Sequence, residues 1–201
     1  MYPPARHLLR DLCLSFAPGA DGHSRRVWLP VVPGIRTDAG RGLVRMGAIA
    51  TLVDVLGGGL AATAAAPDWF ATADLTVHLG DTREPGDRIE AHGRVLRTGR
   101  TTVVMEVDLL RAVGTGLGIA TMTFAVLPRR DSNPVMPAAP ADEVTTMALP
   151  DSGLDGTLVD AIGVRIIDAA PGSVEAPVTD WVRNSMGALQ GGAVATLAEV
   201  A

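Results

Sequence analysis

The stretch MGAIATLVDVLGGGLAATAAA, residues 46–66, decides the fold of this chain. Its apolar residues lie on nearly every side of a helix, and the run is long enough for several turns. A helix without a polar face has to be covered on most sides, so we expect it in the middle of a domain. Pro67 follows directly and is expected to end it.

Four strand-like segments follow this helix and are separated by short glycine-containing turns. Their polar and apolar residues alternate, as in a sheet with one buried face; Ile89 and Ala91 share one face, and Glu90 and His92 the other. The segments are residues 70–79, 87–97, 101–113 and 117–128. The pattern predicts an α+β fold in which an antiparallel sheet wraps one long central helix.

An internal repeat organises the rest of the chain. GAIATLVDV at 47–55 returns as GAVATLAEV at 192–200, with conservative differences only, and the segments upstream of the two copies correspond more loosely. Residues 129–150 are rich in proline and small polar residues and lack periodicity. We therefore expect a first domain at 1–128, a linker at 129–150, and the truncated N-terminal part of a second copy at 151–201.

Composition removes several classes of function. All 17 basic residues are arginine, so neither a lysine-dependent phosphate loop nor Schiff-base chemistry can operate. A net charge of −5 and 3% aromatic residues argue against nucleic acid as a partner. The single cysteine and the spacing of the four histidines predict no disulfide and no metal site. The N-terminus lacks the apolar core of a signal peptide, and no apolar run is predicted to span a membrane, so we expect a cytoplasmic protein.

Each copy of the repeat places a glycine near a helix start and an acid seven residues later. At Gly47 and Gly192, a substrate carbonyl could approach backbone N–H groups at the positive end of the helix dipole. Asp54 and Glu199 lie about two turns further along the same helix face. Such an acid either accepts structural hydrogen bonds from a neighbouring strand or acts as a nucleophile or general base toward the carbonyl.

These residues resemble the hotdog-fold acyl-CoA thioesterases, and specifically the branch of the phenylacetate pathway (PaaI-type). The stretch NSMGALQGGAVATLAE at 184–199 matches the family motif, except that Gln190 replaces the family's histidine. Residues 73–107 look like the remainder of the family's domain. The resemblance covers about 12–128 in full and 151–201 in part. Two copies in one chain are similar to double-hotdog enzymes, in which one polypeptide replaces a dimer.

The resemblance implies hydrolysis of an acyl-CoA thioester to free CoA and a carboxylate, at sites that combine the acid of one copy with the helix start of the other. One composite site then joins Asp54 to the second copy, whereas the other joins Glu199 to Ala39, Arg45 and Gly47. Only the first looks complete, with Gln190 in place of the histidine, and Thr72 matches a family hydroxyl near the attacking water. The implied catalytic set is Asp54, Asn184, Gln190, Gly192, Thr72 and Glu199.

Coenzyme A is expected as part of the substrate, with no separate cofactor. The resemblance implies contacts to it from Gly47 and from the turn RTGR, that is from Arg97, Gly99 and Arg100. Because a truncated copy leaves sheet edges uncovered, we also expect a homo-oligomer. The alternative function is a non-catalytic hotdog protein that binds acyl groups or serves as a scaffold subunit. A hotdog dehydratase is a third alternative, but its characteristic Asp and His pairing is absent around both helices.

Overall fold

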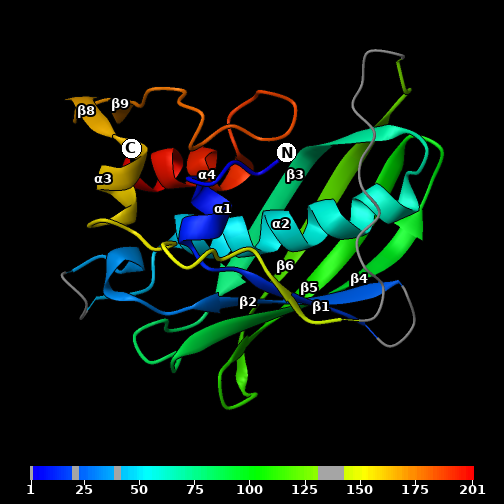
Figure 1. Cartoon of the computed structure of the whole chain (residues 1–201), viewed down its shortest axis with the longest axis horizontal. Coiled ribbons are helices and arrows are strands. Elements are labelled where there is room, and N and C mark those ends of the chain that lie inside the picture. The colour runs from blue at the N-terminus through cyan, green and yellow to red at the C-terminus, as the bar shows by residue number, and fades with distance from the viewer. Residues whose placement is uncertain (1, 20–22, 39–41, 131–142) are drawn as a thin grey trace.

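A seven-stranded antiparallel sheet curves around one long helix in the computed structural model, which describes residues 2–19, 23–38, 42–130 and 143–201 (Figure 1). The strand order is β3-β6-β5-β4-β2-β1-β7. The strands are β1 (Ser15–Pro18), β2 (Ser24–Pro30), β3 (Trp69–Leu79), β4 (Arg88–Thr98), β5 (Thr102–Arg111), β6 (Gly116–Leu127) and β7 (Thr145–Thr146). The helices are α1 (Leu8–Asp11), α2 (Met46–Ala64), α3 (Leu158–Ile162) and α4 (Gly191–Val200), with a short 3-10 turn η1 (Pro33–Ile35). A separate hairpin pairs β8 (Arg165–Asp168) with β9 (Ser173–Glu175).

The central helix and the four following strands confirm the predicted α+β fold. The helix α2 ends at Ala64, three residues before Pro67, which cannot donate a backbone hydrogen bond. Its apolar residues are buried against the sheet, whose inward positions also carry apolar side chains. The fully buried members of this core include Ile49, Leu52, Leu56, Ile89, Ala91, Val103, Met105, Leu109, Met122 and Phe124.

No apolar run was predicted to span a membrane, but the helix α2 is long and apolar enough to do so. It has 19 residues and a mean hydropathy of 1.5, so by length and composition it could cross a bilayer. However, 61% of this window is buried inside the folded chain. The helix therefore has the character of a core helix. A core helix can have the length and composition of a membrane span, because burial in protein and burial in lipid both favour apolar residues.

The segment predicted as a linker, 129–150, is partly built into the sheet. Residues 131–142 lie outside the described ranges, but β7 pairs antiparallel with β1, and the Met147 N–H donates to the Leu14 carbonyl at 2.8 Å. The strand β1 would otherwise present unpaired backbone groups at the sheet edge, and β7 satisfies some of them. The division of the chain into two domains and a linker stays a prediction.

The elements after residue 150 repeat the order of those at the start of the chain: a short helix, a hairpin and a longer helix. The helix α1 is capped by the His7 side chain and α3 by the Thr157 side chain. Each then turns through a left-handed residue, Cys13 with φ 54° and Gly163 with φ 77°. The structural correspondence therefore extends upstream of the two long helices, to positions where the residue types have diverged.

The glycines of α2 differ in how closely they approach the sheet, which gives a matched test of the packing. A Cβ on Gly57 would lie 2.5 Å from Met122 Sδ and 3.0 Å from Phe124 Cε2, whereas one on Gly58 would meet only Phe70 Cε2 at 3.9 Å. We predict that Gly57→Ala destabilises the fold by about 1–3 kcal/mol through overpacking. Gly58→Ala should instead stabilise it by up to about 1 kcal/mol through helix propensity. Urea unfolding of the two variants measures both, and equal effects would contradict the predicted packing.

Candidate active site

The helices α2 and α4 cross in close contact at two glycines (Figure 1). A Cβ on Gly47 would lie 2.7 Å from Thr196 Cα, and one on Gly192 would lie 2.7 Å from Thr51 Cα. The hydroxyls of Thr51 and Thr196 are buried and donate to the carbonyls of Gly47 and Gly192 of their own helices, at 2.8 and 2.9 Å. The four residues are related by the 145-residue offset of the repeat. The contact is therefore reciprocal, as at a two-fold interface.

Because the contact is reciprocal, the acid of each helix lies at the start of the other. A Cβ on Gly191 would lie 2.6 Å from Asp54 Oδ2, so the Asp54 carboxylate lies against the first residue of α4. Glu199 Oε2 accepts a hydrogen bond from the Gly47 N–H at 2.9 Å, at the start of α2. The structure thus brings Asp54 to the second-copy helix and Glu199 to the first-copy helix.

Asp54 is buried, with 9% of its surface exposed, and its one hydrogen bond in the described part of the chain comes from Thr72. Thr72 Oγ1 donates to Asp54 Oδ1 at 2.9 Å. Burial raises the pKa of Asp54, and the hydrogen bond from Thr72 opposes this rise with a smaller effect. The result is a desolvated carboxylate with a higher proton affinity than an ordinary aspartate.

Thr72 reaches Asp54 from an irregular position at the edge of the sheet. The strand β3 is the last strand on its side, and its register with β6 shifts between Thr72 and Asp74. Such a bulge redirects the side chains around it. Thr72 is itself exposed, so the buried carboxylate lies directly beneath a residue that solvent and ligands can reach.

The start of α4 presents free hydrogen-bond donors beside Asp54. Gln190 is the N-cap residue, and its side chain makes no capping hydrogen bond. Within the described ranges, the backbone N–H groups of Gly191 and Gly192 have no acceptor, and the Gln190 amide, 7% exposed, has no partner. Unsatisfied N–H groups at a helix N-terminus carry the positive end of its dipole, so this start favours a negatively charged oxygen.

Asn184 lies in the loop before α4, where its side chain orders the loop. Its Oδ1 accepts from the N–H groups of Met186 and Ala188, at 2.9 and 3.0 Å. No hydrogen bond joins Asn184 to Asp54, so the structure brings this residue only into the loop that leads to the site. Ala39, the corresponding position in the first copy, lies outside the described residues.

The start of α2 differs from the start of α4 because the Gly47 N–H already donates a hydrogen bond. Glu199 binds Gly47, and its other carboxylate oxygen lies 3.6 Å from an Arg45 guanidinium nitrogen, with both side chains less than one fifth exposed. Arg45 Nε is buried without a partner in the described part of the chain. The guanidinium neutralises the acid, and the acid blocks the donor that a substrate carbonyl would need.

The residues expected to contact CoA do not cluster around Asp54. Arg97 near the end of β4 and Arg100 in the β4–β5 turn are exposed, and the Gly99 N–H donates to the Thr102 carbonyl at 2.8 Å. The cross-strand register aligns this turn with Thr72 through β5 and β6, at the same end of the sheet. Three strand spacings of about 4.8 Å separate β4 from β3, or roughly 15 Å. Gly47, the fourth expected contact, is bonded to Glu199.

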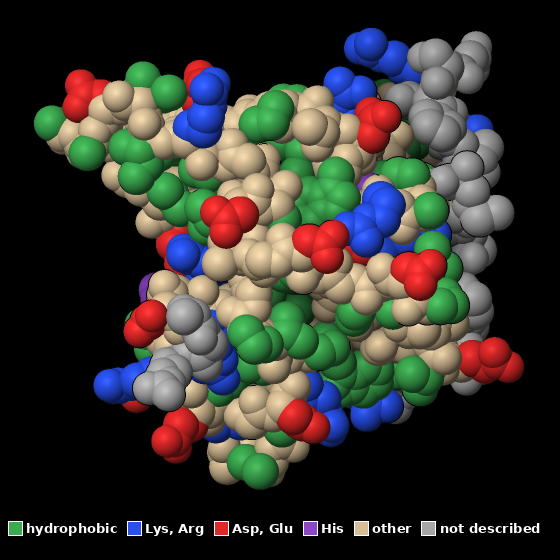
Figure 2. Space-filling view, turned by 60° about the vertical axis from the view of Figure 1, so that its left-hand side comes forward, with side chains coloured by type: hydrophobic (Ala, Val, Ile, Leu, Met, Phe, Trp, Pro, Cys, Tyr) green, Lys and Arg blue, Asp and Glu red, His purple; other side chains and the backbone are tan. Residues whose placement is uncertain are grey.

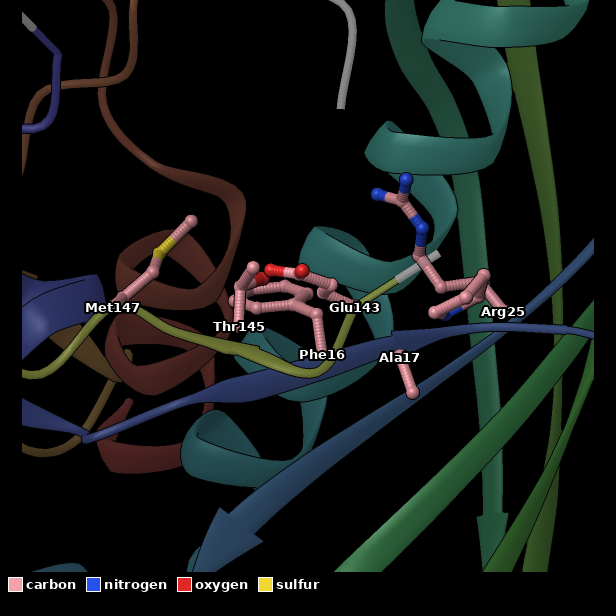
Figure 3. A pocket seen from close by; sticks show the side chains of 7 residues that line it. Phe16, Ala17, Arg25, Glu143, Thr145 and Met147 are labelled. Atoms are coloured by element: carbon pink, nitrogen blue, oxygen red, sulfur yellow. The ribbon is translucent and has the colours of Figure 1, made fainter. Parts of the chain in front are cut away.

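A shallow pocket of about 150 Å³ lies elsewhere, between the β1 edge and the second half of α2 (Figure 3). The Arg25 side chain rises from β2 toward the helix, while Phe16, Thr145 and Met147 line the other side. A Cβ on Gly59 would lie 2.1 Å from Arg25 Nη1, so a larger residue there would displace the guanidinium from its position against α2. None of the lining residues belongs to α4 or β3, so this pocket is separate from Asp54.

The face drawn in Figure 2 carries no patch of a single charge type. On the face in Figure 2, arginine and acidic side chains are interspersed, with hydrophobic side chains between them. Among the residues that the structure describes, no group of three or more His, Cys, Asp or Glu could hold a metal ion. The arrangement of chemical interest is therefore the carboxylate and helix start around Asp54.

Comparisons with known proteins agree with this architecture. A thioesterase from Pseudomonas aeruginosa, solved as a mutant, is 25% identical over 57% of this chain and 81% of its own, with a TM-score of 0.50. A hypothetical protein from Staphylococcus aureus is 17% identical over 61% of this chain and 100% of its own (TM-score 0.54), and the S. sahachiroi protein AziG is 15% identical over 58% and 92% (TM-score 0.51). No curated protein sequence matches the chain.

The long helix wrapped by an antiparallel sheet is the hotdog fold, as the sequence predicted. Residues 42–117, which contain α2 and β3 to β5, match the thioesterase superfamily.

Two features of the site were not predicted from the sequence: the helix contact through Thr51 and Thr196, and the ion pair between Arg45 and Glu199. Thr51 and Thr196 are ordinary helix residues, yet they form the contact surface of the two glycines. Their identity in both copies, four residues after each glycine, is the signal that could have identified them. The ion pair between Arg45 and Glu199 is recognisable only once the crosswise arrangement is known.

The Glu199 contacts predict a structural role that can be measured as stability. Glu199→Ala leaves the Gly47 N–H and the Arg45 guanidinium unpaired, which should cost about 1–3 kcal/mol in the free energy of unfolding. Glu199→Gln keeps an acceptor for Gly47 and should cost less. Glu175→Ala, which breaks the exposed pair with Arg165 in the β8–β9 hairpin, is the control and should have little effect. Three equal losses in urea unfolding would contradict this role.

Asp54 is predicted to lower stability when it is ionised. Its pKa in the folded chain is raised above the ordinary value of 3.8, so the folded state binds the proton more tightly than the unfolded state. The cost is complete above the folded pKa and disappears as pH falls toward the unfolded value. We therefore expect Asp54→Asn to melt at a higher temperature than the parent near neutral pH, and at the same temperature below the unfolded pKa. Asp74→Asn, at an exposed position on β3, is the control. A neutral-pH melting temperature below that of the parent would refute the assignment.

Proposed function

We propose that the chain is an acyl-CoA thioesterase, which hydrolyses the thioester to free CoA and a carboxylate between α2 and α4. The observation that carries this proposal is the buried Asp54 carboxylate held against a helix start whose N–H groups are free. An acid and an anion-stabilising group are the two elements that acyl transfer to water requires. The match of residues 42–117 to the thioesterase superfamily and the likeness to the P. aeruginosa thioesterase support the reaction type.

The start of α4 would polarise the thioester. The substrate carbonyl oxygen would accept hydrogen bonds from the Gly191 and Gly192 N–H groups, which become stronger as negative charge develops on that oxygen. The glycines are needed because a Cβ on either would meet Asp54 or Thr51. The Gln190 side chain, 7% exposed and without a hydrogen bond in the described chain, supplies a further donor where the family has histidine.

Asp54 would act in its ionised form. It either attacks the carbonyl carbon, expelling the CoA thiolate and leaving an anhydride for water to cleave, or removes a proton from the attacking water. Both routes benefit from desolvation, because a carboxylate with a raised pKa is a stronger base and a less solvated nucleophile. Thr72 holds Oδ1 in place and, being exposed, can also contact the incoming water.

The other residues would have supporting roles. Asn184 orders the loop that delivers Gln190, and Arg97 and Arg100 offer guanidinium groups to the phosphates of CoA, beside the Gly99 backbone. Because Glu199 occupies the Gly47 N–H, we propose one working composite site in the chain, with Glu199 as a structural acid. The PaaI-type assignment and the double-hotdog arrangement are part of this proposal. So is homo-oligomerisation, which the open edge of β3 in the described sheet favours.

The decisive experiment measures free thiol released from a panel of acyl-CoA esters. Asp54→Asn should reduce kcat by roughly 10²- to 10⁴-fold, the usual effect of removing an acid-base group. Glu199→Gln should retain most of the activity, and Asp74→Asn is the matched control on the exposed strand.

Two outcomes would contradict the proposal. Equal losses in the Asp54 and Glu199 variants would mean that the two starts are equivalent. Folded parent protein that binds acyl-CoA without hydrolysing any ester would favour the non-catalytic binding module instead.

A further inference from the structure

Arg25 on β2 is half-buried and has no partner among the residues that the structure describes. Its guanidinium donates no hydrogen bond and forms no ion pair within these ranges, whereas the other half-buried arginines, Arg10, Arg36, Arg45 and Arg111, all have partners. Burial lowers the pKa of the Arg25 guanidinium. Because an unpaired charge that is partly removed from water is unfavourable, this position favours an anion that the described chain does not supply.

The Arg25 side chain is held in place against the second half of α2. It lies on the same face of β2 as Val27, which is fully buried, and the opposite face carries Arg26. A Cβ on Gly59 would lie 3.0 Å from Arg25 Cζ and 3.5 Å from Arg25 Cδ, so the guanidinium and its stem both pack on this glycine. An anion that binds Arg25 therefore meets a cation that is already ordered, which lowers the entropic cost of binding.

The pocket beside Arg25 combines an apolar wall with a second polar group (Figure 3). Phe16 lies opposite Thr145 in the pairing of β1 with β7, and Met147, two residues further on, lines the same pocket. The Thr145 hydroxyl makes no hydrogen bond within the described ranges. The volume of about 150 Å³ is similar to that of a protein cavity that holds one benzene molecule. The pocket therefore has room for a body about the size of one aromatic ring.

We propose that this pocket binds a small organic carboxylate, whose charged group pairs with Arg25 and whose apolar body packs against Phe16 and Met147. A planar carboxylate matches the fork of donors on a guanidinium, and the Thr145 hydroxyl can donate a further hydrogen bond to it. Glu143, the acid among the lining residues, is exposed, so solvent weakens its repulsion of the anion. This site does not depend on the proposed thioesterase reaction, because none of its lining residues belongs to α4 or β3.

Isothermal titration calorimetry of the whole chain with benzoate tests the site, because benzoate is one carboxylate on one aromatic ring. We expect saturable binding with a Kd of about 1 mM. Arg25→Gln should raise this Kd at least about tenfold, whereas Arg26→Gln, on the opposite face of β2, should leave it unchanged. Inorganic phosphate and benzyl alcohol should each bind at least about tenfold more weakly, because one lacks the apolar body and the other lacks the charge. Absence of saturable benzoate binding, an unchanged Kd in Arg25→Gln, or a phosphate affinity equal to that of benzoate would overturn the inference.

A second pair of variants keeps Arg25 and changes its position. Gly59→Ala places a methyl group where the guanidinium now lies, so it should displace Arg25 and raise the benzoate Kd by about fivefold or more. Gly58→Ala adds the same methyl group one residue earlier, where it would meet Phe70 Cε2 at 3.9 Å, and it should leave the Kd unchanged. Circular dichroism establishes that both variants are folded. Equal Kd values in the two folded variants would mean that the position of the guanidinium does not matter, which contradicts the proposed site.

Discussion

The close crossing of α2 and α4 is the contact on which the rest of the site depends. Gly47 and Gly192 bring each helix backbone against a buried threonine of the other, and neither position has room for a side chain. Only at this separation can a short acid seven residues further on reach the N-terminus of the opposite helix. A larger residue at either glycine would separate the helices, and both carboxylates would lose contact with their helix starts.

The two copies of the helix motif place their acids in different surroundings. Glu199 is one methylene longer than Asp54, and it binds the Gly47 N–H and the Arg45 guanidinium together. Asp54 lies against Gly191 at the start of α4, whose N-cap residue Gln190 is neutral, and it has only a threonine hydroxyl as a hydrogen-bond partner in the described chain. Burial raises the pKa of the Asp54 carboxyl, and the hydrogen bond from Thr72 opposes this rise only in part. The two helix starts thus differ because Arg45 in the first copy corresponds to Gln190 in the second, and Asp54 in the first copy corresponds to Glu199 in the second.

The sequence predicted the parts of the fold that have a periodic signal. The apolar run at 46–66 and the alternation around Ile89 and Ala91 correspond to α2 and β4 because burial on one face or all faces leaves a regular pattern. The pairing of β7 with β1 was not predicted, because two residues of strand in a proline-rich segment have no period. The attachment of the N-terminal segment was not predictable either, since it depends on hydrogen bonds of Arg10 and His7 with segments far away in the chain. The candidate acid and its threonine were suggested by family resemblance, whereas the ion pair at Arg45 needed the three-dimensional arrangement.

The two copies of the helix motif are parts of one polypeptide, and this has a consequence for how the site can evolve. In a dimer of identical chains, any substitution at a helix start appears at both starts at once, so a change that improves one site as a structural contact also damages the other as a reactive centre. A tandem repeat removes this constraint, because positions 45 and 190 are encoded separately. One copy can accumulate substitutions that stabilise the helix contact while the other keeps its free N–H donors. The two helix starts can then take different roles.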